Sequence, residues 1–157
     1  MLLVVLRHAD AEPTASSDAA RRLTDKGRRQ ADRLAAYLQR IGLAADRVVT
    51  SPYARAVETA RPIADALGAP LVEDDTLACG MAPEDAAALL AHECDPDDCV
   101  ILVGHQPDCG WLLAWLCGVA DSGNLAVKKG ACAIVELDRP AAGEGVLRAF
   151  LPPKLLP

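Results

Sequence analysis

The sequence predicts an α/β protein with three layers, in which helices cover both faces of a mainly parallel central sheet. Short continuous runs of Val, Leu and Ile, such as 2–6 and 99–105, are typical of strands buried on both faces. These runs alternate with longer segments in which apolar residues recur every three or four positions, the spacing of an amphipathic helix. Regular alternation of strands and helices indicates parallel strands joined by crossover helices.

Local signals place the ends of several elements. Thr24 is expected to cap a helix that stops at Gly42. Ser51 and Pro52 are expected to cap and begin the next helix, and Pro62 inside that helix should kink or split it. The last two strands flank a glycine-containing turn and are expected to form a hairpin. The predicted strands span 2–6, 47–51, 70–74, 99–105, 131–138 and 146–152, and the predicted helices span 25–41, 51–68, 83–92 and 107–118.

Length and charge limit the kind of protein that this chain can be. Its 157 residues, 52% of them hydrophobic and 24% charged, fit one globular domain over 1–157. The net charge of −6 argues against nucleic acid as a partner, because binding to phosphate backbones needs a basic surface. No run approaches the roughly 20 apolar residues of a membrane span, and 2–6 is too short for a signal peptide. We therefore expect no membrane association and a cytoplasmic location.

The six cysteines do not follow a metal-binding pattern. The spacings Cys94-x4-Cys99 and Cys109-x7-Cys117 differ from the paired C-x2-C motifs of structural zinc sites. Disulfides are not expected in a cytoplasmic chain. The sequence thus predicts no metal and no cofactor, and most of the cysteines are expected to be small buried hydrophobic residues.

Polar residues of a restricted kind follow three of the predicted strands. Arg7 and His8 follow the first strand, Ser51 and Arg55 follow the second, and His105 ends the fourth. Ligands of open parallel sheets bind at the carboxyl ends of the strands. We therefore expect these residues, although distant in sequence, to converge on one edge of the sheet.

Each of these residues also has a structural interpretation when it is taken alone. His8 could cap a strand, and His105 could form a hydrogen bond within a turn. Arg55 could be a solvated helix residue paired with Glu58 three positions on. These interpretations do not explain why all of the residues fall at strand ends.

Two arginines and two histidines at one edge suit phosphoryl transfer. Guanidinium groups bind phosphoryl oxygens in pairs and remain charged at any working pH, and the N–H groups at the start of a helix add positive potential. A neutral imidazole can attack phosphorus and form a phosphohistidine intermediate. A second imidazole can donate to the phosphoryl oxygens, so that no metal is required.

Four motifs, in this order, resemble those of the histidine phosphatase superfamily, also called phosphoglycerate-mutase-like: LRHADAE, RRLTDKGRRQA, VVTSPYARAVETA and VGHQP. The short chain and the LT-x-x-G after the first loop resemble the phosphohistidine phosphatase SixA group of that superfamily. The resemblance extends from Met1 to about Leu137 and implies the phosphoglycerate-mutase-like fold.

The resemblance implies roles for the residues at matching positions. His8 would be the nucleophile that becomes phosphorylated, and Arg7 and Arg55 would hold the phosphoryl oxygens. His105 would donate to the phosphoryl group in the transition state.

Three further positions have weaker assignments. Arg21 matches a basic position that would reach the pocket edge, and Arg22 competes for that role. Ser51 is expected mainly to cap its helix, with phosphate contact as a second possibility. Ala9 stands where the superfamily usually has glycine, so a conventional backbone is expected there.

The substrate prediction depends on a general acid. Mutases and many sugar-phosphate phosphatases of this superfamily have an acidic residue after the third strand as proton donor. The acidic residues in that region here lie in no matching motif: Glu73, Asp74, Asp75 and Glu84. The imidazole that leaves a phosphohistidine departs without a positioned acid, whereas an alkoxide needs one.

We therefore predict metal-independent hydrolysis of phosphohistidine in a phosphotransfer protein or domain. A small-molecule ester phosphatase and a non-catalytic phosphohistidine-binding module remain alternatives. A mutase fits least, because a mutase must enclose its substrate and the chain has too few residues for the necessary lid. Lys128 and Lys129 could lie near the pocket and help to dock an acidic partner.

Overall fold

A computed structural model describes residues 1–155, apart from the side chain of Asn124, and contains a single six-stranded sheet in the order β3-β2-β4-β1-β5-β6. The strands are β1 (Leu2–Arg7), β2 (Arg47–Thr50), β3 (Leu71–Glu73), β4 (Cys99–Gly104), β5 (Cys132–Leu137) and β6 (Gly145–Leu151). The helices are α1 (Asp25–Arg40), α2 (Ala54–Leu67), α3 (Pro83–Glu93) and α4 (Asp108–Leu116). Short 3-10 turns lie at Asp75–Leu77 and Ser122–Asn124. None of the described helices is long and apolar enough to cross a membrane.

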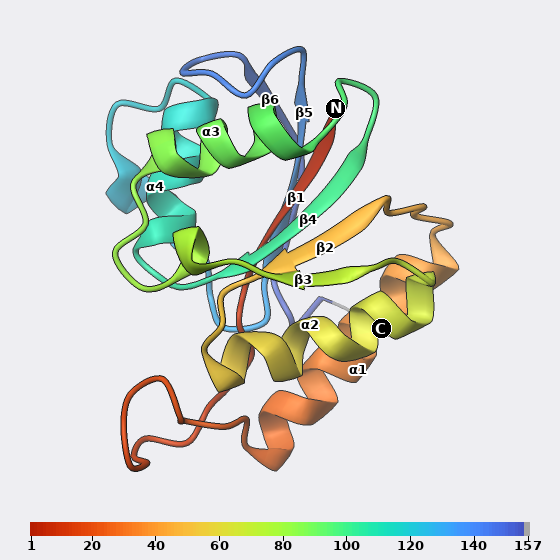
Figure 1. The fold of residues 1–157 in the computed structure, drawn as a ribbon, viewed down its shortest axis with the longest axis vertical. Helices are drawn as coiled ribbons and strands as arrows, with labels where there is room; N and C mark the ends of the chain where they lie inside the picture. Colours follow the sequence, from red (N-terminus) through yellow and green to blue (C-terminus); the bar gives the residue numbers. More distant parts are fainter. Residues whose placement is uncertain (156–157) are drawn as a thin grey trace.

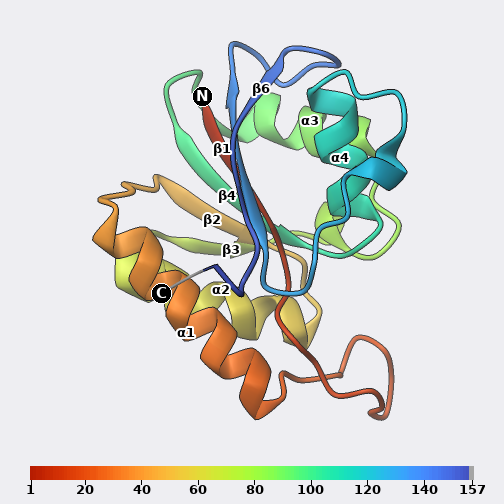
Figure 2. The same cartoon turned by 180° about the vertical axis from the view of Figure 1, so that it is seen from behind.

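Helices cover both faces of the sheet, as the sequence predicts. Helices α1 and α2 lie on one face, and α3 and α4 lie on the other (Figures 1 and 2). Side chains of β1 alternate between the two: Val4 and Leu6 belong to the buried cluster of α1 and α2, whereas Leu3 and Val5 belong to that of α3 and α4. The continuous apolar run at the N-terminus exists because both of its faces are buried.

The sheet is mainly parallel. Strands β1 to β4 pair in parallel, while β5 is antiparallel to β1 and forms the predicted hairpin with β6. The register sets Arg7 opposite Gly104 and Thr50 opposite Val103, so the three strands end at the same edge. The residues that follow these strands are therefore neighbours in space.

The start of α2 differs from the sequence prediction. Thr24 caps α1 as expected, since its side chain accepts from the N–H of Gly27. The prediction that Ser51 caps α2 is wrong, because α2 begins at Ala54 and its N-cap residue, Tyr53, makes no side-chain cap bond. Pro62 lies within one continuous helix, which it does not split. The hydroxyl of Ser51 is buried in the site described below.

Helix α1 approaches the segment after β1 very closely. A Cβ atom added to Gly27 would lie 1.9 Å from the carbonyl oxygen of Asp10, which also accepts from the N–H of Thr24 at 3.0 Å. Only glycine permits this approach, so Gly27 fixes the course of the chain just beyond His8.

Gly27→Ala tests this contact against helix propensity. Propensity alone predicts stabilisation by up to about 1 kcal/mol, whereas the clash with backbone predicts a loss of about 1–3 kcal/mol. We expect the loss, measured as the free energy of unfolding in urea. Lys26→Ala, on an exposed position in the same turn, is the matched control. A stabilised Gly27→Ala variant would show that the chain relieves the contact with Asp10 at little cost.

Candidate active site

His8 immediately follows β1 and is 5% exposed. Its Nδ1 lies 2.7 Å from the carbonyl oxygen of Ala9. Because a carbonyl only accepts, Nδ1 holds the proton and Nε2 presents a lone pair. That lone pair accepts from Nε of Arg55 at 3.3 Å. The ring is thereby held in the tautomer that leaves Nε2 as its nucleophilic atom.

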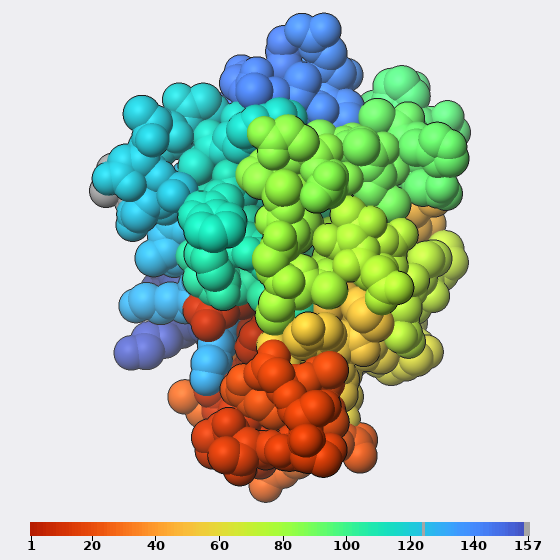
Figure 3. Space-filling view, turned by 60° about the vertical axis from the view of Figure 1, so that its left-hand side comes forward, coloured from red at the N-terminus to blue at the C-terminus, as the bar shows by residue number. Residues whose placement is uncertain are grey.

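Arg55, in the first turn of α2, is 3% exposed and turns its guanidinium toward the loop between β1 and α1. Its Nη1 donates to the backbone oxygen of Asp18 at 2.6 Å, and its Nη2 lies 2.9 Å from the Asp18 carboxylate. Figure 3 shows this loop, in red and orange, as a lobe beside the start of α2. The interpretation of Arg55 as a solvated residue paired with Glu58 is wrong, since Glu58 instead binds Arg22 and the N–H of Leu23.

His105 follows β4 and is 2% exposed. Its Nε2 lies 2.8 Å from Oγ of Ser51, and that Oγ also accepts from the N–H of Tyr53 at 3.3 Å. The ring centroid of His105 is 5.3 Å from that of His8 and 5.0 Å from that of Tyr53. Nδ1 of His105 is buried without a hydrogen-bond partner among the described residues. If Ser51 donates to Nε2, Nδ1–H is the free donor of this ring.

Arg7 and Ala9 flank His8. Arg7 donates from Nη1 to the carbonyl of Val127 at 3.0 Å, and its buried Nε has no partner in the described part of the chain. The N–H of Ala9 donates to Oγ1 of Thr59 at 3.0 Å, and Thr59 is fully buried on α2. Ala9 has a conventional backbone as predicted, since among residues 1–155 only glycines have positive φ.

Two residues that the sequence did not single out help to build the site. Thr59 ties α2 to the segment after β1, because Oγ1 accepts from Ala9 and donates to the carbonyl of Arg55 at 2.6 Å. Asp18 bridges Arg55 and Arg21, whose Nη1 lies 2.7 Å from the Asp18 carboxylate. A buried threonine and an aspartate in a long polar loop have no periodicity or motif that could have revealed them.

Arg21, rather than Arg22, is the basic residue nearer the site. Arg21 donates to the carbonyl of Glu12 at 2.6 Å as well as to Asp18, whereas Arg22 is drawn away by Glu58. Arg21 and Arg55 thus bind the same carboxylate, that of Asp18.

The acidic candidates of the sequence lie elsewhere. The side chain of Asp74 caps the 3-10 turn by accepting from the N–H of Thr76, and Asp75 and Glu84 are exposed. Among the described residues no hydrogen bond or ion pair joins any of these three acids to His8 or His105. Asp108 is the unexpected carboxylate: it is 2% exposed, its Oδ2 accepts from the N–H of Gly80 at 2.9 Å, and its Oδ1 has no partner within residues 1–155.

Burial and positive neighbours keep the imidazoles of His8 and His105 neutral. Desolvation, aided by the charges of His105, Arg55 and Arg7, lowers the pKa of His8 to about 3. Desolvation and the charge of Arg55 lower the pKa of His105 to about 4. Hydrogen bonds from Arg21 and Arg55 lower the pKa of Asp18. The site therefore combines positive guanidiniums with two unprotonated imidazoles at neutral pH.

The cysteines take no part in a metal cluster. Cys99, Cys109 and Cys132 are buried, so the prediction that most of the six cysteines are buried holds for only half of them. Cys79 is exposed and lies 3.5 Å from Nη2 of Arg55. All six are free thiols. Within residues 1–155, no group of three or more His, Cys, Asp or Glu side chains is placed to hold a metal ion.

Comparison with known proteins gives this site a family. The model described as Histidine phosphatase superfamily (branch 1) matches residues 3–78. Phosphohistidine phosphatase SixA of Escherichia coli strain K12 is 32% identical over 120 residues, which cover 74% of this chain and 74% of that protein. The chain belongs to the histidine phosphatase superfamily. It is therefore a phosphatase, and the phosphoglycerate-mutase-like fold expected from the motifs is confirmed.

Solved structures of this superfamily share the whole fold. The protein histidine phosphatase SixA in complex with tungstate is 27% identical, with a TM-score of 0.87 over 100% of both chains. A phosphoserine phosphatase mutant from Entamoeba histolytica in complex with phosphoserine is 18% identical, with a TM-score of 0.73 over 98% of both chains. The second likeness concerns the fold alone.

The lowered pKa values predict a loss of stability in mild acid. The unfolded chain binds protons at its histidines near pH 6.5 while the folded chain does not, so stability falls as the pH drops below that value. As the pH falls from 7.5 to 5.5, we expect His8 and His105 each to lower the free energy of unfolding by about 1.4 kcal/mol. Urea titrations at the two pH values measure this loss.

The matched variant for this test is His8→Asn, which removes one of the two titrating rings. It should lose about half as much stability as the wild type over the same pH interval. The pKa of Asp18 is lowered, so this carboxylate titrates below this pH interval and does not contribute to the measured loss of stability. An equal loss in both proteins would show that His8 protonates freely in the folded state.

Proposed function

We propose that this chain is a cytoplasmic, single-domain, metal-independent phosphatase that removes the phosphoryl group from phosphohistidine in a phosphotransfer protein. The observation that supports it most is the state of His8: Nδ1 is bound to Ala9, and Nε2 is unprotonated and faces Arg55. Such an imidazole is a nucleophile at neutral pH without the help of a base.

The reaction proceeds in two displacements. Nε2 of His8 attacks phosphorus, the P–N bond of the substrate breaks, and the leaving imidazole keeps the electron pair and takes a proton from solvent. Water then attacks the phosphoryl group on His8, the Nε2–P bond breaks, and inorganic phosphate leaves. Both steps transfer the same group, so the same cations serve each of them.

Three groups stabilise the charge of the phosphoryl oxygens in this proposal. Arg55 Nε already lies at the attacking nitrogen, and the buried Nε of Arg7 is a donor without a partner in the described chain. Nδ1–H of His105 is the third donor. Ser51 positions His105 and does not itself need to touch phosphate. The incoming phosphoryl group competes with Asp18 for the guanidinium of Arg55.

The carboxylates at the site support the proposed substrate class. Asp18, bonded to two arginines, has a lowered pKa and is a poor proton donor. A phosphohistidine needs no positioned acid, whereas a phosphate ester does. The similarity to SixA, whose name states a phosphohistidine phosphatase, points the same way. Since the chain is a phosphatase by family, the non-catalytic binding module is a weaker alternative than the ester phosphatase.

The first test measures phosphate release in EDTA from a phosphorylated histidine phosphotransfer domain and from p-nitrophenyl phosphate. We expect the phosphodomain to be the better substrate and His8→Ala to lower its turnover at least about 10³-fold. Arg55→Ala should lower it about 10²–10³-fold through lost charge stabilisation.

A phosphoenzyme trapped during turnover should show acid-labile, alkali-stable label that is absent from His8→Ala. Full activity of His8→Ala, or loss of activity in EDTA that returns with a divalent ion, would refute the proposed mechanism.

The ester phosphatase is the second candidate, and Asp108 is the observation that favours it. This buried carboxylate has one oxygen without a partner in the described chain and lies in the first turn of the helix after His105. If it supplies the proton to an alkoxide, Asp108→Asn lowers ester turnover by about 10²–10⁴-fold.

Our proposal predicts a different outcome for Asp108→Asn. Phosphohistidine turnover should stay within about threefold of the wild type, because its leaving group needs no acid. Parallel kcat measurements on the phosphodomain and on p-nitrophenyl phosphate distinguish the two functions. A strong loss on both substrates would assign Asp108 to the common phosphoenzyme chemistry instead.

A further inference from the structure

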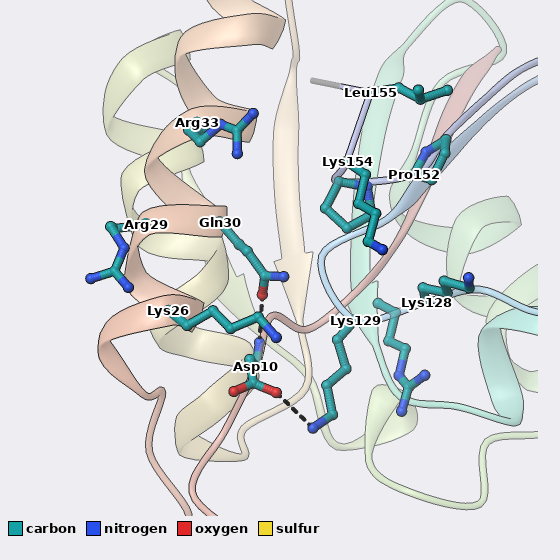
Figure 4. Close-up of a pocket in the computed structure, with 12 residues that line it drawn as sticks. Asp10, Lys26, Arg29, Gln30, Arg33, Lys128, Lys129, Pro152, Lys154 and Leu155 are labelled. Carbon is teal, nitrogen blue, oxygen red and sulfur yellow. Dashed lines mark hydrogen bonds and ion pairs between the residues drawn. The ribbon is translucent and has the colours of Figure 1, made fainter. Parts of the chain in front are cut away.

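A basic groove of about 710 Å³ lies beside the candidate active site, between α1 and the C-terminal segment (Figure 4). Cationic side chains dominate its lining although the whole chain has a net charge of −6. They are Arg7, Lys26, Arg29, Arg33, Lys128, Lys129 and Lys154. Among the described residues that line it, Asp10 is the one acid.

Besides Arg7 at the end of β1, three chain segments supply these cations. Lys26, Arg29 and Arg33 are spaced three and four residues apart and so share one face of α1 over two turns. Lys154 faces them from the C-terminal segment, and Lys128 and Lys129 come from the segment before β5 (Figure 4). Positive charge that converges from three segments raises the local potential well above that of scattered surface cations.

The groove adjoins the candidate active site at Arg7. Arg7 lines the groove and also acts by its charge on both His8 and His105. Asp10, two residues after His8, is held by Lys129 at 2.8 Å, and its N–H donates to Gln30 of α1 at 2.9 Å. A ligand in the groove therefore lies next to the group that His8 attacks.

The kind of cation indicates the kind of ligand. Lys26, Arg29, Lys128 and Lys154 are exposed, and none of them is buried in a preformed cage. Exposed charges over two helical turns suit several weak contacts with another surface, whereas a small anion is held by a few converging, desolvated donors. We propose that this groove docks the acidic protein surface that flanks the phosphohistidine of the partner, an inference that rests on the proposed function.

Charge reversal in the groove tests the proposal. The variant Lys26→Glu/Arg29→Glu changes two exposed positions of α1, neither of which belongs to the site around His8. The control Arg61→Glu/Arg139→Glu makes the same change in net charge at positions outside the groove. The probes are a phosphorylated histidine phosphotransfer domain with carboxylates around its phosphohistidine, and free phosphohistidine, which has the same P–N bond without the surface.

We expect the groove variant to lower kcat/KM for the phosphodomain about tenfold or more at low salt, mainly through a higher KM. The difference from the wild type should shrink as added salt screens the charges. Turnover of free phosphohistidine should be unchanged, and the control variant should match the wild type on both probes.

Several results would overturn the docking proposal. One is an unchanged rate on the phosphodomain, and another is an equal loss on free phosphohistidine, which would show a disturbed active site. Tripolyphosphate binding that disappears in the groove variant, with the KM for the phosphodomain unaltered, would assign the groove to a small polyanion.

The docking proposal can be tested even if the proposed function is wrong. If the wild type hydrolyses neither phosphohistidine probe, that function is wrong, and the groove is then tested by titration with the unphosphorylated domain. Binding by the wild type and the control, at least about tenfold weaker in the groove variant at low salt, supports docking. Equal binding by all three proteins, or none, overturns it.

Discussion

Parallel pairing of β1 with β4, and of β4 with β2, is the constraint on which the site depends. The pairing sets Arg7 opposite Gly104 and Thr50 opposite Val103, so the next residues on each strand share one edge. His8, His105 and Ser51 thus become neighbours although about half the chain separates the first two. Two hydrogen bonds with α2 then hold these residues in place: Thr59 accepts from the N–H of Ala9, and Arg55 donates to His8.

Burial at this edge separates charge in a way that suits nucleophilic attack. Two imidazoles with lowered pKa values lie beside two arginines, so the edge keeps its positive charge on guanidiniums and its lone pairs on histidines. A buried guanidinium without a counter-ion would be costly, and Asp18 supplies one to Arg55 from an exposed loop. A carboxylate on a loop can give way to a phosphoryl group more readily than one in the core. The same arrangement therefore stabilises the fold and accepts an anionic substrate.

How much the sequence could predict depended on how local each signal was. Continuous apolar runs identified the strands, and the side-chain cap of Thr24 identified the start of α1, because both signals lie within a few residues. The cap assigned to Ser51 was wrong because its hydroxyl bonds to His105, which is 54 positions away and invisible to a local pattern. The partner of Arg55 was missed for the same reason: Asp18 is 37 residues upstream, and the nearer Glu58 is engaged by Arg22.

In our proposal, two different groups of charged residues bind the phosphoryl group and select the partner. In the proposed mechanism, the donors around His8 bind a phosphoryl group without contacting what it is attached to, and a fold of this kind is found both in a histidine phosphatase and in a phosphoserine phosphatase. Discrimination must then come from surfaces outside the transferred group. We propose that the basic groove, which meets the candidate active site at Arg7, makes that distinction by the charge of the partner. Selection of this kind changes the rate of encounter and leaves the phosphoryl-transfer step itself unaltered.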